Sequence, residues 1–144
     1  MVSEPDLSIR VANDLKELAV IAEQVDEFCG QREIAPTIAY QVNLSLDELL
    51  TNTISYGYEE GARHEIRIDL SIDGDRLMIR IEDDARQFDL TDSDPNKADT
   101  DSGLDDRMPG GLGIFFVHQM MDTVSYRREN NKNVVLLGKK FETE

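Results

Sequence analysis

The chain has 144 residues, 40% of them hydrophobic, which suits one globular domain and is too short for two sizeable cores. Thirty acidic and fifteen basic residues give a net charge of −15, so we expect no direct binding to nucleic acid. Cys29 is the single cysteine, which excludes an internal disulfide and a cysteine metal cluster. No stretch is long and apolar enough to cross a membrane, and the N-terminus lacks a signal pattern. We therefore expect a cytoplasmic protein without membrane contact.

The first part of the chain predicts one strand and two helices. Residues 7–11 alternate like a strand, and Asn13 then reads as the N-cap of a helix that Gly30 ends. Pro36 suits the first turn of a second helix, which we expect to run to about Tyr58.

A β-hairpin is predicted next, because apolar side chains alternate with polar ones on both sides of "DGD". With Asp73 and Gly74 as a two-residue turn, the apolar residues oppose one another on one face. The predicted pairs are Leu70 with Leu77, Ile68 with Ile79, and Ile66 with Ile81.

Residues 89–109 hold seven Asp and no sustained apolar period, which is typical of a lid, a binding loop or disorder. The glycine-rich "GGLGIFFVHQMMD" then predicts a short apolar helix, and "TVSYRR" and "NVVLLGKKF" predict a closing strand pair around "ENNK". This order favours an α+β fold, a two-layer α/β sandwich whose mixed, mostly antiparallel sheet is covered on one face by three helices.

The second predicted helix carries a polar stripe that includes Glu48 and Asn52, one helical turn apart. From spacing alone the stripe reads as a solvated face. However, Asp47 and Glu48 are the only charges between Thr37 and Tyr58, and this favours a wet internal cavity. Asn52 offers an oxygen suited to Mg²⁺, and Glu48 could position or deprotonate a hydroxyl or water that attacks a phosphate.

Two more stretches carry candidate binding groups. In "IEDDARQFD", Asp83 lies at a strand end, where its carboxylate could accept a hydrogen bond from a ligand amino group. In "GGLGI", residues 110–114, glycines before a helix let backbone N–H groups approach phosphates. Alone, each stretch also reads as an ordinary turn.

In this order and spacing the motifs resemble the GHKL (Bergerat-fold) ATPase superfamily, closest to the anti-sigma-factor serine kinases of bacterial partner-switching systems. The resemblance runs from about Leu7 to Lys140. It implies that Glu48 is the catalytic general base, that Asn52 is the Mg²⁺ ligand and that Asp83 holds the adenine amino group. The implied ATP-binding residues are Asn52, Asp83, Ala85, Gln87, Arg107, Gly110, Gly111, Leu112, Gly113 and Ile114.

The resemblance also implies one histidine-kinase-like ATPase domain over residues 1–144, with an ATP lid at about 89–109. The implied activity is a serine/threonine protein kinase that uses ATP and Mg²⁺. It would phosphorylate a STAS-domain anti-anti-sigma protein and sequester a sigma factor or similar target. A homodimer is expected from the resemblance alone.

The sequence departs from the superfamily at Ala85 and Gln87, where Gly is frequent, and at Tyr56, where His is frequent. Ala85, Gln87 and the acidic lid favour a second hypothesis, a sequestering module of the same fold with weak or no catalysis. A fragment of a sensor histidine kinase is a third, disfavoured because no predicted helix presents a phosphoacceptor His.

Overall fold

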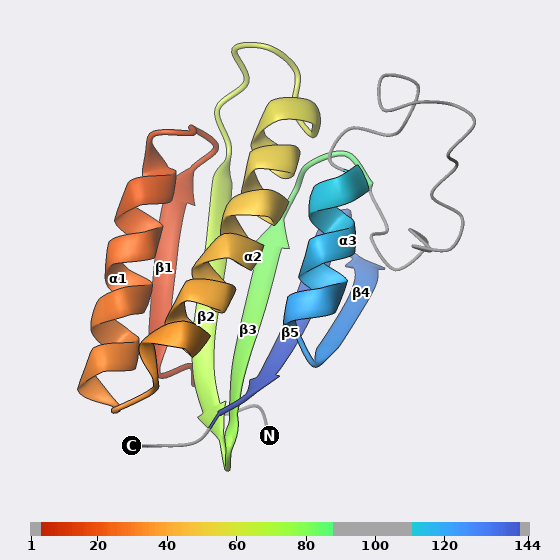
Figure 1. The fold of residues 1–144 in the computed structure, drawn as a ribbon. Helices are drawn as coiled ribbons and strands as arrows, with labels where there is room; N and C mark the ends of the chain where they lie inside the picture. Colours follow the sequence, from red (N-terminus) through yellow and green to blue (C-terminus); the bar gives the residue numbers. More distant parts are fainter. Residues whose placement is uncertain (1–3, 88–110, 142–144) are drawn as a thin grey trace.

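The protein is described by a computed structural model over residues 4–87 and 111–141. The elements of this part of the chain, shown in Figure 1, are β1 (Leu7–Ala12), α1 (Glu17–Gln31), α2 (Pro36–Tyr56), β2 (Glu65–Asp73), β3 (Arg76–Asp83), α3 (Gly111–Met120), β4 (Thr123–Glu129) and β5 (Lys132–Lys140). The strands form one five-stranded sheet in the order β1-β2-β3-β5-β4. Every strand pairing among the described residues is antiparallel. This part of the sheet is therefore purely antiparallel, not mixed as predicted.

The three helices lie on one face of the sheet, which gives two layers with the core between them (Figure 1). Alternate side chains of the two central strands point into that core and are at most 2% exposed: Ile66, Ile68, Leu70, Leu77, Ile79 and Ile81. Full burial of such a side chain contributes roughly 1.5–3 kcal/mol. The predicted α+β sandwich with helices on one face is confirmed. Within the described residues, no helix combines the length and the apolar character needed to cross a membrane.

The register of the β2–β3 hairpin differs from the predicted register by two residues. Leu70 pairs with Ile79 and Ile68 with Ile81, because the turn residues are Gly74 and Asp75 rather than Asp73 and Gly74. Gly74 has φ = +63°, which suits the first central position of a type II′ turn. A shift of two residues keeps every side chain on its predicted face.

The predicted N-cap role of Asn13 is wrong. Its side chain instead connects the end of β1 to the segment before β2, donating to Ala62 O (2.9 Å) and accepting from the His64 N–H (2.8 Å). Asp14 Oδ1 accepts from the Lys16 N–H (3.0 Å), and α1 begins one residue later.

The ends of both long helices also differ slightly from prediction. Helix α1 runs one residue past Gly30, and the left-handed conformation that follows it falls on Glu33, with φ = 56°. Helix α2 stops at Tyr56 rather than near Tyr58, where the Gly57 N–H bonds to Thr53 O at 2.8 Å. These offsets leave the polar stripe of α2 intact.

Candidate nucleotide-binding site

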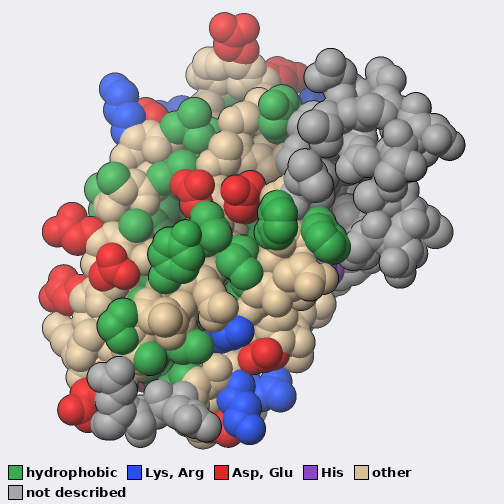
Figure 2. All heavy atoms as spheres, in the orientation of Figure 1, with side chains coloured by type: hydrophobic (Ala, Val, Ile, Leu, Met, Phe, Trp, Pro, Cys, Tyr) green, Lys and Arg blue, Asp and Glu red, His purple; other side chains and the backbone are tan. Residues whose placement is uncertain are grey.

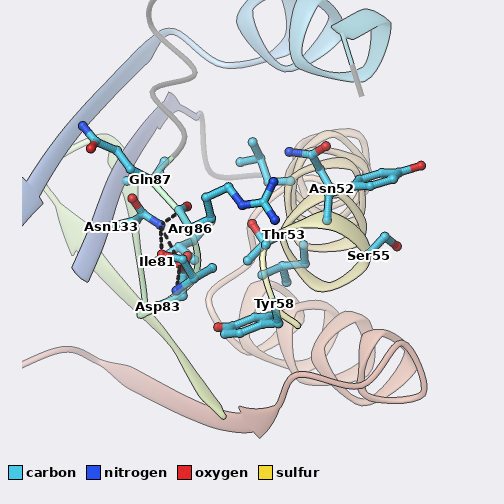
Figure 3. A pocket seen from close by; sticks show the side chains of 15 residues that line it. Asn52, Thr53, Ser55, Tyr58, Ile81, Asp83, Arg86, Gln87 and Asn133 are labelled. Carbon is cyan, nitrogen blue, oxygen red and sulfur yellow. Dashed lines mark hydrogen bonds between the residues drawn. The ribbon is translucent and has the colours of Figure 1, made fainter. Parts of the chain in front are cut away.

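A pocket of about 530 Å³ opens where the C-terminal ends of α2 and β3 meet (Figure 3). Its walls come from the second half of α2, the end of β3 with the turn that follows, and the start of β5. The volume lies within the range of small-molecule and cofactor sites. The polar stripe of α2 reaches this pocket through Asn52 and Ser55, which agrees with the cavity interpretation rather than the solvated face.

Asp83 is the acidic group of the pocket and is only 4% exposed. Its Oδ1 accepts hydrogen bonds from the Ala85 N–H (3.0 Å) and from Asn133 Nδ2 (2.9 Å). Burial raises the pKa of Asp83 above its ordinary value, although these two hydrogen bonds oppose the shift. Its Oδ2 makes no hydrogen bond to another described residue. That oxygen is therefore available to accept a hydrogen bond from an amino group on a ligand.

Asn133, on β5, holds the end of β3 in place and was not predicted as a site residue. It pairs with Asp83 across the sheet and is 5% exposed. Its Nδ2 also donates to Ala85 O (3.2 Å) and Arg86 O (3.0 Å). Its Oδ1 accepts from Tyr126 Oη (2.6 Å) and Arg128 Nη1 (3.0 Å). One side chain thus fixes both the carboxylate and the turn after it.

Asn52 supplies a buried oxygen that lacks a hydrogen-bond partner among the described residues. The residue is 8% exposed and lies on the α2 wall, opposite Asp83 (Figure 3). A buried carbonyl oxygen without a partner costs roughly 1–3 kcal/mol, which a bound cation or water would offset. In residues 4–87 and 111–141, no three His, Cys, Asp or Glu side chains form a metal cluster. Mg²⁺ needs only one or two protein oxygens beside water and phosphate, so the residues present fit that ion.

Glu48 lies one turn before Asn52 on α2, at the contact with α3. It does not line the pocket itself. A Cβ added at Gly113 would overlap the Glu48 carboxylate, so only glycine lets the start of α3 come this close without moving Glu48. The structure therefore brings together two residues, 65 apart in sequence, that the motifs assigned to catalysis and to phosphate binding.

The remaining predicted site residues fall into four groups. Ala85 and Gln87 line the pocket, the first buried and the second exposed. Ile114 points its side chain into the core, at 1% exposed, so only its backbone could face a ligand. Gly111 and Leu112 belong to α3, and the structure does not describe their side chains. Arg107, Gly110 and the predicted lid at 89–109 lie outside the described residues.

Residues 11–139 match the histidine kinase-like ATPase domain family. The chain belongs to this family. The three sequence motifs predicted membership of the GHKL superfamily, and this match confirms that prediction. A histidine kinase-like ATPase domain implies the use of a nucleotide.

Curated relatives of this ATPase domain are named serine-protein kinase RsbW. The protein of Listeria monocytogenes serovar 1/2a is 28% identical over 97 residues, which cover 66% of this chain and 62% of the relative. The Bacillus subtilis protein is 26% identical over 102 residues, which cover 69% of this chain and 62% of that protein. The Staphylococcus aureus (strain JH9) protein is 30% identical over 94 residues, which cover 63% of this chain and 59% of that protein. The chain thus spans less than two thirds of these relatives' lengths.

Two solved structures share the fold. The RsbU and RsbW domains of Rv1364c from Mycobacterium tuberculosis superpose with a TM-score of 0.62 at 9% identity, covering 95% of this chain and 33% of that one. The histidine kinase domain of the blue-light activated histidine kinase from Erythrobacter litoralis EL346 superposes with a TM-score of 0.53 at 18% identity. The match covers 88% of this chain and 60% of that one. At these identities the likeness concerns the fold alone.

Proposed function

We propose that this chain binds Mg-ATP and phosphorylates Ser or Thr of a STAS-domain antagonist while it sequesters a sigma factor or similar target. One observation carries the nucleotide part of the proposal. In the described part of the chain, one pocket has a buried carboxylate, Asp83, on one wall and a buried oxygen without a hydrogen-bond partner there, Asn52 Oδ1, on the opposite wall. An amino-bearing base at Asp83 and a phosphate-bound cation at Asn52 would match both groups.

Each residue of the site would have its own role in nucleotide binding or phosphoryl transfer. Asp83 accepts a hydrogen bond from the base amino group, and Asn133 keeps that carboxylate oriented. Asn52 contributes one oxygen to Mg²⁺, while the backbone at the start of α3 approaches the phosphates. Glu48 accepts the proton of the attacking hydroxyl. Mg-ATP supplies the transferable phosphoryl group and the metal charge that offsets its negative oxygens.

The charge of the helical layer supports a partner with a basic surface. Helices α1 and α2 carry six acidic residues and no Lys or Arg: Glu17, Glu23, Asp26, Glu27, Asp47 and Glu48. Figure 2 shows acidic side chains over these helices, whereas Lys and Arg side chains lie mostly toward the two ends of the molecule. Such a field speeds encounter with an oppositely charged protein and repels like-charged ones.

Thermal unfolding with and without Mg-ATP tests the nucleotide site. Ligand at a hundred times its dissociation constant stabilises a fold by roughly 2.7 kcal/mol, so the wild-type midpoint should rise clearly. Asn52→Ala should lose most of that rise, whereas Thr51→Ala, a neighbour outside the pocket lining, should keep it. If the wild type shows no rise, the nucleotide proposal is wrong.

Transfer of labelled γ-phosphate separates a kinase from a sequestering module. Candidate STAS-domain proteins are incubated with the chain and labelled Mg-ATP, and label on Ser or Thr is measured. A kinase labels one of them. Nucleotide binding together with a tight target complex but no labelled antagonist would favour the second hypothesis, a sequestering module.

A further inference from the structure

Arg86 is the one basic residue among the described side chains that line the pocket, as Asp83 is the one acidic residue. Its backbone is fixed, because the Arg86 N–H donates to Gly57 O (2.8 Å) and its carbonyl accepts from Asn133 Nδ2 (3.0 Å). The side chain therefore starts from a constrained point between the end of β3 and the end of α2. None of the motifs assigned it a role.

The Arg86 side chain points into the pocket. Figure 3 shows it leaving the cluster of Asp83 and Asn133 and extending across toward Thr53 on α2. The guanidinium makes no ion pair or side-chain hydrogen bond with another described residue. By contrast, Arg67 and Arg80 pair with carboxylates at 3.0 and 2.7 Å. Arg86 is exposed, and its guanidinium thus has several unused N–H donors along the lining of the pocket rather than in an ion pair.

The charged and amide groups of the pocket therefore follow one another in a defined order. A carboxylate lies on the wall formed by β3 and β5, a guanidinium extends across the middle, and an amide oxygen lies on the α2 wall. The chain as a whole carries a net charge of −15, so an anionic ligand needs a local positive group to be held. A guanidinium can give a phosphate two parallel hydrogen bonds, which a single ammonium cannot match in geometry.

We propose that the Arg86 guanidinium binds a phosphate of the nucleotide, between the base at Asp83 and the metal at Asn52. This inference rests on the proposed function, because it assigns a contact within the same pocket. It makes Arg86 a side chain that favours a phosphorylated ligand over its nucleoside. The positive charge needed near the phosphates then comes from the end of β3, in addition to any bound Mg²⁺.

Calorimetry with three probes tests the assignment: adenosine, Mg-ATP and Mg-tripolyphosphate. Arg86→Gln keeps the backbone hydrogen bonds and removes the charge. It should weaken Mg-ATP and tripolyphosphate roughly tenfold to a hundredfold and leave adenosine within about threefold. Arg86→Lys should restore part of the loss. Arg76→Gln is the matched control, since it removes the same charge at the far end of β3 and should change no affinity.

Each other result has a definite meaning. Equal Mg-ATP affinity in wild type and Arg86→Gln overturns the assignment and leaves the proposed function standing. An equal loss for adenosine and Mg-ATP also overturns it, because Arg86 would then contact the base. If the wild type binds tripolyphosphate through Arg86 but neither adenosine nor ATP, the anion site holds and the nucleotide proposal fails. If no probe binds the wild type, both are wrong.

Discussion

Gly57 and Ala85 pack directly against each other where the end of α2 meets the end of β3. A Cβ added at Gly57 would stand 2.7 Å from the Ala85 Cβ, closer than real Cβ atoms approach. Ala85 is 3% exposed, so its methyl group offers the pocket little surface. The methyl that replaces the frequent glycine of the superfamily thus fits into space that a second glycine leaves.

Ala85→Gly should therefore leave nucleotide affinity within about threefold of wild type. The variant loses one buried methyl and gains backbone freedom, which should lower the free energy of unfolding by roughly 1–2 kcal/mol. Calorimetric titration with Mg-ATP and urea denaturation measure the two effects. A tenfold gain in affinity would show instead that the methyl obstructs the ligand.

Gly57→Ala should lower the free energy of unfolding more than Ala85→Gly does. Its new methyl would meet Thr53 O and the Ala85 methyl, and overpacking of this kind costs roughly 1–3 kcal/mol. Urea denaturation of the single variant and of Gly57→Ala with Ala85→Gly gives the coupling between the positions. The double variant should recover part of the loss, and strictly additive losses would contradict the packing relationship.

Replacement of Asn133 by Ala should destabilise the fold and weaken nucleotide binding together. The change leaves Ala85 O, Arg86 O and the Tyr126 hydroxyl without this partner, so we expect a loss of roughly 2–4 kcal/mol in the free energy of unfolding. Gln119→Ala, which shortens an exposed side chain on α3, should change it by less than about 0.5 kcal/mol. A stable Asn133→Ala protein with unchanged affinity for Mg-ATP would remove Asn133 from the site.

Asp83→Asn should separate stability from binding. The amide oxygen can still accept from the Ala85 N–H and Asn133 Nδ2, while the buried charge is gone. We expect the free energy of unfolding at pH 7 to stay equal or rise. The stabilisation by Mg-ATP should disappear, because an NH₂ group would face the ligand amino group.

The difference in stability between Asp83→Asn and wild type should depend on pH, because the pKa of Asp83 is raised. A raised pKa means that the folded protein binds this proton more tightly than the unfolded chain does. Ionised Asp83 therefore lowers stability above its folded pKa, and the effect disappears as the pH falls through that pKa toward the ordinary value of 3.8. Urea denaturation from pH 7 to pH 4 should show the advantage of Asp83→Asn shrinking. An advantage that grows in acid would contradict the assigned direction.

The sequence predicted the elements of this site better than the contacts between them. Helical and alternating periods located α2 and β3, and hydrophobic phase put the correct faces inward. A register shift of two residues leaves that phase unchanged, so the pattern could not choose between the two alignments. The observed pairing of Asp73 with Arg76, which leaves Gly74 and Asp75 as the turn, decides between them.

Polar residues with two plausible roles were the main source of error. Asn13 satisfies the preferences of an N-cap, yet its amide serves a loop 49 residues away in the chain. Asn133 resembles any polar residue at a strand start, and its partner Asp83 is 50 residues distant. The observed pairing of β3 with β5 places Asn133 opposite Asp83, and no local motif carries that information.

Glu48→Gln should slow phosphoryl transfer by roughly 10²–10⁴-fold while Mg-ATP affinity stays within about threefold. The amide keeps the size of the side chain but cannot accept the hydroxyl proton. Asp47→Asn is the control, since it removes a neighbouring charge on the exposed side of α2. Labelled phosphate on the antagonist protein is the readout, and equal rates for Glu48→Gln and wild type would remove Glu48 from catalysis.

Gly113→Ala should affect the same step without unfolding the protein. The added methyl would meet the end of the flexible Glu48 side chain rather than backbone, so the carboxylate can swing aside. We expect the free energy of unfolding to fall by less than about 1.5 kcal/mol and transfer to slow at least tenfold. A displaced Glu48 carboxylate in a structure of the variant would confirm the cause.

The turn at Gly74 lies at the far end of the hairpin from the pocket, yet the placement of Asp83 depends on the distance between them. Eight residues of β3 span roughly 26 Å at 3.3 Å each, with side chains alternating between the faces. A single inserted residue in β3 would turn the Asp83 carboxylate to the uncovered face of the sheet. Length changes in this strand among related ATPase domains should therefore occur in steps of two.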